Sequence, residues 1–237
     1  MRTKAFAVVL CLLAGAVAVG CADGAGTTDT RSADQLLGDA NGTMKALTSV
    51  TIVMEITSAS GGKGYSSRLM TDLKSRCRLK ATWSYGPELE HIRIGETDYI
   101  HPNDAYLDMW SRGTVPAMRN KPWLKSPVSE ARGADNLADC VWPFSSSGKA
   151  MKGDPTELDD KPVIPVEVPD DEVEGGHYTF YVAAEGKPYL LRVDHRDSHH
   201  RRITEFSGFN DRVDIQPPPA ADVLDLSSLP PDASGSG

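Results

Sequence analysis

A chain of 237 residues has room for one large domain or two small ones, and 40% hydrophobic with 24% charged residues is ordinary for a globular protein. The formal net charge is −8, and the only charged residues before Cys21 are Arg2 and Lys4, so the chain from Cys21 onward carries −10. An acidic domain of this kind lacks the clustered basic side chains that bind phosphates, which excludes nucleic acid as a partner.

The first 20 residues have the pattern of a signal peptide. A basic start is followed by an apolar run from Ala5 to Val19, and Gly20 then precedes Cys21. Fifteen residues suit the core of a signal peptide but fall short of the roughly 20 that a membrane-spanning helix needs. The sequence therefore predicts that residues 1–20 are removed, that the chain is exported, and that only its N-terminus holds it to a membrane.

Cys21 is the predicted attachment point. Residues 18–21 resemble the bacterial lipobox, in which the cysteine thiol is diacylated and the preceding peptide bond is cut, although Ala18 stands where Leu is commonest. Two acyl chains anchor a protein stably, whereas one binds only marginally. Plain secretion after cleavage at Ala18 or Gly20 is the alternative. Residues 21–31, small and polar, are then a flexible tether at the outer face of the cytoplasmic membrane.

A helix is expected next, and strands follow it. Ser32 is a good N-cap, and apolar residues recur at helical spacing as far as Leu47. From Val50 the period changes to two, which is typical of strands. The expected strands before the middle of the chain are 51–57, 65–71, 77–84 and 88–94, with a further alternating stretch around Tyr99.

The second half repeats this pattern after a helical middle. We expect helices at 103–110 and 129–142, and then strands at 162–168, 177–184, 188–194, 201–206 and 213–216. Composition marks no break between the two strand clusters, which favours one continuous sheet. The predicted organisation is a signal peptide at 1–20, a tether at 21–31, one domain at 32–227 and a disordered tail at 228–237.

Two cysteines remain once Cys11 is removed with the signal peptide and Cys21 is assigned to the anchor. In an oxidising compartment Cys77 and Cys140 are more often paired than free. Closing that loop stabilises the fold by about 4 kcal/mol on the chain-entropy model. The alternative, a catalytic or metal-binding thiol, has no Cys-x-x-Cys motif or neighbouring histidine in the sequence to support it.

A search for catalytic patterns finds no active site. His195 and His199 could be offered to a metal, but the surrounding run of mixed charge is more typical of a hairpin tip. Glycines 61, 62 and 64 lack the Lys-Ser/Thr ending of a phosphate loop, and paired aspartates fall in polar connectors. The sequence therefore predicts no enzyme, no cofactor and no metal.

Three segments resemble a known family. Residues 93–107, 181–193 and 213–226 are similar to actinobacterial cell-envelope lipoproteins of the LppX/LprAFG group, which share the LolA/LolB-like half-barrel. The resemblance extends over about residues 32–226, and Cys77 and Cys140 are placed as in the members that carry a disulfide. It implies an α+β fold in which a strongly curved antiparallel β-sheet packs helices against its concave face.

The same resemblance implies a function. In that family the space between sheet and helices is an apolar pocket for the acyl chains of a lipid or lipoglycan, and such a monomeric carrier needs no cofactor. The residues that we expect to line the pocket are apolar and lie in the predicted helices and strands. They are Leu36, Leu47, Ile52, Met54, Ile56, Ile92, Ile94, Tyr99, Trp110, Phe180, Val182 and Leu191.

Each of these residues would equally serve an ordinary filled core. A surface interaction or sensor lipoprotein with a filled core is therefore the alternative function. The two differ in one observable: an apolar cavity of several hundred cubic ångströms favours a lipid carrier, and its absence favours the alternative.

Overall fold

The computed structural model describes residues 29–61, 64–109, 118, 120–130, 139–146 and 148–228. Contacts within the chain divide it into two units, residues 1–30 and 31–237, and the fold described below is that of the second. The expected signal peptide, Cys21, most of the tether and nearly all of the tail lie outside the described residues, and so does Trp110.

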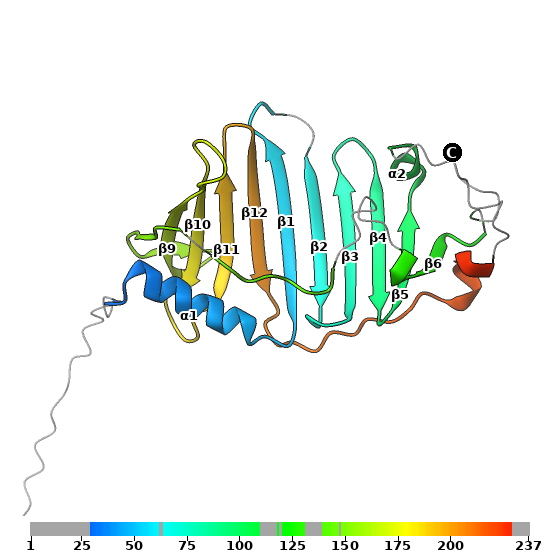
Figure 1. Ribbon diagram of the computed structural model, residues 1–237, viewed down its shortest axis with the longest axis horizontal. Coiled ribbons are helices and arrows are strands. Elements are labelled where there is room, and N and C mark those ends of the chain that lie inside the picture. The colour runs from blue at the N-terminus through cyan, green and yellow to red at the C-terminus, as the bar shows by residue number, and fades with distance from the viewer. Residues whose placement is uncertain are drawn as a thin grey trace, which may run out of the picture. The chain divides into compact units, whose positions relative to one another are not determined.

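One sheet of 13 strands dominates the described residues (Figure 1). Its order is β13-β6-β5-β4-β3-β2-β1-β12-β11-β10-β9-β7, and β8 pairs with β9 off this path. The strands of the first half are β1 Val50–Ser58, β2 Tyr65–Thr71, β3 Arg76–Trp83, β4 Glu88–Ile94, β5 Thr97–Pro102 and β6 Trp123–Pro127. Those of the second half are β7 Met151–Lys152, β8 Thr156–Leu158, β9 Lys161–Pro169, β10 His177–Ala183, β11 Leu190–Arg196, β12 His200–Ser207 and β13 Val223–Asp225.

The expected continuous sheet is confirmed by the pairing of β1 with β12. This antiparallel pair joins the strands β1 to β5 to the strands β9 to β12, with Ile52 opposite Phe206. The neighbouring pairs are antiparallel as well, except that β13 runs parallel to β6. Residues 208–222 pass along one end of β1 to β5 and so bring β13 to the far edge (Figure 1).

Helices are few, so the described domain is mostly β. They are α1 Ala33–Lys45, α2 Asp104–Met109 and the short 3-10 turns η2 Val128–Glu130, η4 Ala220–Asp222 and η5 Leu226–Ser228. Helix α1 contacts β7, β9, β10 and β11, whereas α2 contacts β4. Figure 1 shows α1 lying across one face of the second strand cluster.

The sequence of α1 explains both its start and its buried side. Ser32 caps the helix as expected: its hydroxyl accepts the N–H of Gln35, and the Gln35 side chain accepts the N–H of Ser32. Leu36, Leu37, Ala40 and Met44 recur at helical spacing and are buried in the core. The same core contains Ile52, Leu69, Leu79 and Phe206, so α1 and these strand residues share one face of the sheet, called the inner face here.

Two expectations about the elements were wrong, and strands β6, β7, β8 and β13 were not expected. Residues 213–216 are irregular rather than a strand, and residues 139–142 of the expected helix 129–142 are irregular as well. Strand β6 was not expected, because its short run around Trp123 lies among prolines and shows no alternation. The strands at β2 and β4 and the helix at α2, by contrast, begin and end within one residue of their expected bounds.

Candidate functional site

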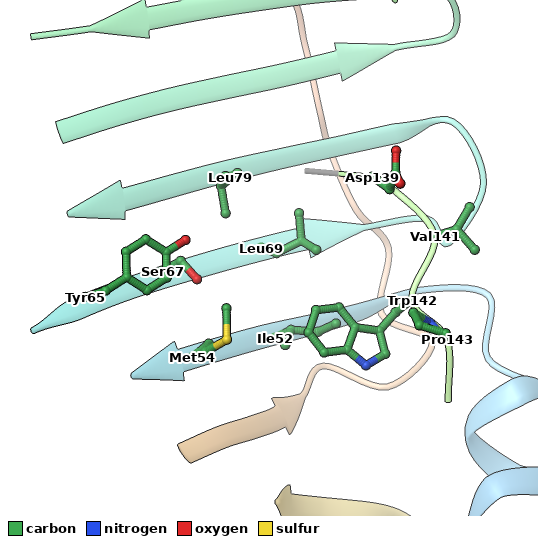
Figure 2. A pocket seen from close by; sticks show the side chains of 10 residues that line it. All are labelled: Ile52, Met54, Tyr65, Ser67, Leu69, Leu79, Asp139, Val141, Trp142 and Pro143. Atoms are coloured by element: carbon green, nitrogen blue, oxygen red, sulfur yellow. The ribbon is translucent and has the colours of Figure 1, made fainter. Parts of the chain in front are cut away.

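A cavity of about 440 Å³ opens on the inner face of β1, β2 and β3 (Figure 2). Its floor is formed by side chains that alternate along these strands, and its wall by residues 139–143, called the wall segment below. The lining consists of Ile52, Met54, Tyr65, Ser67, Leu69, Leu79, Asp139, Val141, Trp142 and Pro143. Eight of these ten residues are aliphatic or aromatic, and the other two are Ser67 and Asp139, so the cavity suits a mainly apolar occupant.

Strand register explains why the floor is continuous. Leu69 of β2 lies opposite Ile52 of β1 on one side and opposite Leu79 of β3 on the other. Met54 and Ser67 form the next cross-strand pair on the same face. Because side chains alternate between the two faces of a strand, these residues form adjoining rows, with Tyr65 at the end away from the wall segment (Figure 2).

The wall segment is tied to the sheet at Cys140. The expected disulfide between Cys77 and Cys140 is confirmed, and it joins the wall segment to the start of β3. The hydroxyl of Thr71 in β2 also donates a hydrogen bond to the carbonyl oxygen of Cys140. These two links hold an irregular stretch of chain against the sheet.

Aromatic contacts fix the other end of the wall segment. Trp142 meets Phe206 of β12 edge-to-face, with ring centroids 6.2 Å apart, and Phe144 packs on the same ring at 5.8 Å. Val141, between the disulfide and Trp142, is 59% exposed although it lines the cavity. The wall segment therefore places apolar side chains over the floor without filling the space beneath them.

A buried ionic cluster lies beside the cavity on the inner face. His91 lies directly opposite Leu79 of the cavity floor. Its Nε2 is 2.8 Å from Oδ1 of Asp98, and Nε of Arg93 donates to the same oxygen at 2.7 Å. Nη1 of Arg93 also reaches Asp139 of the wall segment at 3.3 Å, so the cluster is a further link between sheet and wall.

Asp98 is the centre of this cluster. Burial raises the pKa of Asp98, but hydrogen bonds from His91 and Arg93 outweigh burial and hold that pKa below its ordinary value. Within the described residues, Nδ1 of His91 is a buried polar atom without a hydrogen-bond partner. The period of β4 alone does not show which carboxylate faces His91, because Asp98 lies on the neighbouring strand β5.

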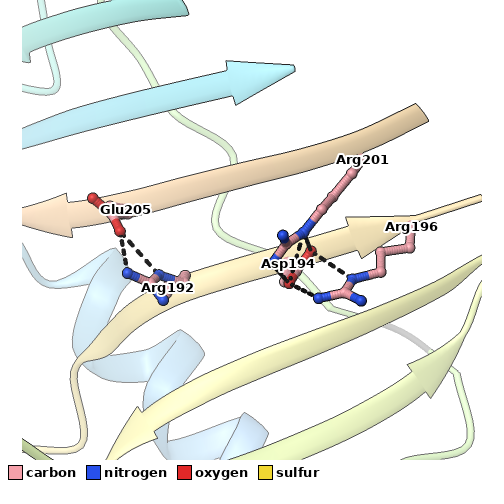
Figure 3. A network of polar contacts seen from close by, with 5 residues as sticks. All are labelled: Arg192, Asp194, Arg196, Arg201 and Glu205. Carbon is pink, nitrogen blue, oxygen red and sulfur yellow. Dashed lines mark hydrogen bonds and ion pairs between the residues drawn. The ribbon is translucent and has the colours of Figure 1, made fainter. Parts of the chain in front are cut away.

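The opposite face of the sheet carries paired charges. On β11 and β12, Asp194 accepts hydrogen bonds from Arg196 at 2.9 Å and Arg201 at 2.6 Å, and Arg192 pairs with Glu205 (Figure 3). Arg201 and Asp194 belong to the face opposite Val193 and Thr204. This face is called the outer face.

The residues expected to line a ligand pocket lie in different surroundings. Ile52 and Met54 line the cavity, and Ile56 lines a second hollow farther along β1. Leu36, Leu47, Phe180 and Val182 are buried, and Leu191 is half-buried beside an irregularity in the pairing of β10 with β11. Ile92, Ile94 and Tyr99 alternate with His91 and Arg93 and so belong to the outer face, while Trp110 is not described.

Most of the cavity was missed from the sequence. Tyr65, Ser67 and Leu69 have the spacing of one strand face and could have been grouped with Ile52 and Met54 through the expected hairpin. The wall segment could have been found from the expected disulfide, since pairing Cys140 with Cys77 brings Val141 and Trp142 to β3. Expecting a helix at 129–142 concealed that signal.

Within the described residues, no group of three or more histidine, cysteine, aspartate or glutamate side chains is arranged to hold a metal ion. His195 instead meets Asp170, with Nε2 and Oδ2 2.9 Å apart. None of the helices in the described part of the chain is both long and apolar enough to cross a membrane.

Comparison with solved structures finds similarity at low sequence identity. The chain is similar to the lipoprotein LppX of Mycobacterium tuberculosis, at 14% identity and a TM-score of 0.49, over 78% of this chain and 100% of the other. It is similar to LprF of Mycobacterium bovis, at 13% identity and a TM-score of 0.48, over 78% and 96%.

A LolA superfamily protein of Nitrosomonas europaea is also similar, at 10% identity and a TM-score of 0.32, over 75% of this chain and 92% of the other. No family model and no curated protein matches the sequence.

Proposed function

We propose that this protein is a lipoprotein, anchored through diacylated Cys21 at the outer face of the cytoplasmic membrane, which carries or presents a lipid or lipoglycan in the cell envelope. The observation that carries the proposal is the apolar cavity of about 440 Å³ between β1–β3 and the wall segment. Residues 21–31 serve as the tether, residues 32–227 as a monomeric binding domain with no catalytic role, and residues 228–237 as a tail.

The cavity has the size and lining of a ligand site. Its volume falls within the range of roughly 300–1,000 Å³ that is usual for small-molecule pockets. A group the size of a water molecule takes up about 30 Å³ of liquid volume, so the cavity accepts roughly fifteen such groups, enough for one acyl chain. In this proposal the inner face is the concave side of the half-barrel that the family resemblance implies.

Carriage by this site requires only shielding. Removing apolar surface from water is favourable by about 25 cal/mol per Å², so a chain held between Leu69, Leu79 and Trp142 is stabilised relative to solution. The tether keeps the cavity near the bilayer from which the chain comes. The alternative function, that of a surface interaction or sensor lipoprotein, predicts a filled core. The open cavity weighs against that alternative.

The test uses the whole mature sequence in its exported Cys21→Ala form, which lacks the acyl anchor. Hexadecanoic acid carrying a nitroxide on its chain is titrated in, and the tryptophan emission is recorded. Trp142 lines the cavity, so a bound chain quenches it, and Trp142→Phe lowers the quenched fraction. Absence of quenching, together with absence of co-purified lipid in native mass spectrometry of the acylated protein, would overturn the proposal.

A pair of neighbouring variants shows whether the chain occupies this cavity. Ser67 lines it and is buried, whereas Ser66 is exposed and belongs to the other face of β2. Ser67→Phe fills the cavity and is expected to weaken binding at least about tenfold, while Ser66→Phe leaves it unchanged. Thermal unfolding of both variants checks that each is folded, and equal affinities of the two would contradict the assignment.

A further inference from the structure

A second, polar hollow lies farther along β1 on the same face as the apolar cavity. Ile52, Met54 and Ile56 follow one another on the inner face of β1. The first two line the cavity, and Ile56 lines a hollow of about 240 Å³ whose other residues are His195, Asp197, His200 and Arg202. Successive residues on one face of a strand are about 7 Å apart, so the two spaces are neighbours.

Strand register joins the two spaces across the sheet as well as along β1. Ile56 lies opposite Tyr65 of β2, which lines the apolar cavity, and opposite Arg202 of β12, which lines the polar hollow. Arg202 in turn lies opposite His195 of β11. The cross-strand row of Tyr65, Ile56 and Arg202 therefore joins a residue of the apolar cavity to a guanidinium group. An amphiphile needs both, because one of its ends is apolar and the other is charged.

The carboxylates around the polar hollow already have partners. Oδ2 of Asp170 is 2.9 Å from Nε2 of His195. Oδ1 of Asp197 accepts the backbone N–H of His199 at 2.6 Å and of His200 at 2.7 Å, and these bonds lower the pKa of Asp197. Asp170 is thus paired with β11, and Asp197 holds the backbone of the β11–β12 turn.

Arg202 differs from the other arginines of these two strands. On the outer face Arg192, Arg196 and Arg201 each pair with a carboxylate (Figure 3). Arg202, exposed on the inner face, has no hydrogen bond or ion pair in the described ranges. A guanidinium group is matched in shape and charge by a carboxylate or a phosphate, which it binds through two parallel hydrogen bonds.

We infer that the polar hollow binds the anionic headgroup, a phosphate or carboxylate, of the amphiphile whose chain occupies the apolar cavity, with Arg202 as its cationic partner. This inference rests on the proposed function. The headgroup supplies to Arg202 the negative group that Asp194 supplies to Arg201 on the other face. His200, beside Arg202 in the hollow, is a second donor within the same space.

Three single-chain probes of equal length test the headgroup in the exported Cys21→Ala form. They are hexadecyl phosphate, monohexadecanoyl glycerol and hexadecyltrimethylammonium, each titrated below its micelle concentration by calorimetry. We expect the phosphate to bind about tenfold more tightly than the glycerol ester and the ammonium to bind most weakly. Added salt should narrow this difference, because an exposed charge pair is screened.

Two neighbouring arginines give a matched pair of variants. Arg202→Gln is expected to lower the affinity for hexadecyl phosphate about tenfold and to leave the glycerol ester unaffected. Arg201→Gln changes a charge one residue away on the outer face and should leave both affinities as they are. Asp197→Asn keeps an oxygen for the two backbone N–H groups and removes a negative charge from the hollow, so it should tighten phosphate binding.

The outcomes separate the inference from the proposed function. If none of the three probes binds, the proposed function fails. If all three bind with equal affinity, or if Arg202→Gln and Arg201→Gln act alike, the headgroup site is overturned while the acyl-chain cavity stands. Inorganic phosphate alone is the last probe: displacement of hexadecyl phosphate by millimolar phosphate would show a site for the free ion and would overturn the assignment to a lipid headgroup.

Discussion

Two parts of the inner face are covered in different ways. Over β9 to β11 a helix packs regularly, and Leu36, Leu37, Ala40 and Met44 of α1 fill the space above the sheet. Over β1 to β3 the cover is the wall segment, an irregular stretch held at Cys140 and by aromatic contacts. A helix supplies a side chain at every turn, whereas a tethered stretch covers the floor without filling it. The cavity follows from that difference.

The largest expected effect comes from releasing the wall segment. Replacing Cys77 and Cys140 together by alanine should lower the free energy of unfolding by about 4 kcal/mol on the chain-entropy model. It should also weaken binding of the nitroxide-labelled chain, because Val141 and Trp142 lose their attachment to β3. Denaturant unfolding and the quenching titration measure the two effects.

The useful control for this variant is the part of the inner face below α1. Probe chains should still fail to bind there, because Leu36 and Met44 fill it whether or not the disulfide is present. Unchanged affinity after removal of both sulfurs would show that the disulfide is not what maintains the cavity.

A second pair of variants compares the filled and the open part directly. Leu36 of α1 is fully buried against the sheet, so Leu36→Ala should destabilise the protein by about 3 kcal/mol, which combines the lost transfer free energy with the cavity that is left. Met54 lines a space that is already open, so Met54→Ala should cost less than about 1 kcal/mol. Urea unfolding gives both values, and similar losses would mean that the cavity floor is as tightly packed as the region under α1.

How much of these two parts can be predicted from the sequence depends on whether the residues that form them are near one another or far apart in the chain. The helix at α1 follows from Ser32 and a periodic stripe, which are local, and the structure confirms both. The disulfide follows from counting cysteines in an exported chain. The cavity needs the register of three strands and the position of an irregular segment at least 60 residues away in sequence, and no local pattern encodes either.

The buried cluster shows the same limit. His91, Arg93 and Asp98 come together because β4 and β5 pair with Arg93 opposite Asp98. Read along the chain, these residues look like the polar positions of an alternating strand. Their burial depends on what covers β4 and β5, which the sequence of these strands does not contain.

The smallest expected effect concerns the ion pairs of β11 and β12 on the outer face. Burial raises the pKa of Asp194, but hydrogen bonds from Arg201 and Arg196 outweigh it and hold that pKa below the ordinary value. Because the folded pKa is the lower one, the stabilisation is present above the unfolded value of about 3.9 and is lost as the pH falls through the folded pKa. Asp194→Asn should therefore cost about 1 kcal/mol at pH 7, a modest amount since Arg196 and Arg201 are 50% and 44% exposed.

The pH profile makes this prediction specific to the ion pairs. Unfolding free energies of the original protein and of Asp194→Asn should differ at pH 7 and converge as the pH falls from about 4 through the lowered pKa of folded Asp194, because below that pKa both carry an uncharged group at position 194. Added salt at pH 7 should reduce the same difference. A difference that persists unchanged at pH 2 would mean that Asp194 stabilises the outer face by packing, and that the paired charges of Figure 3 contribute little. In that case Arg201→Gln would no longer be a matched control for Arg202→Gln. The comparison of the two variants assumes that Asp194 holds Arg201 by charge on the outer face.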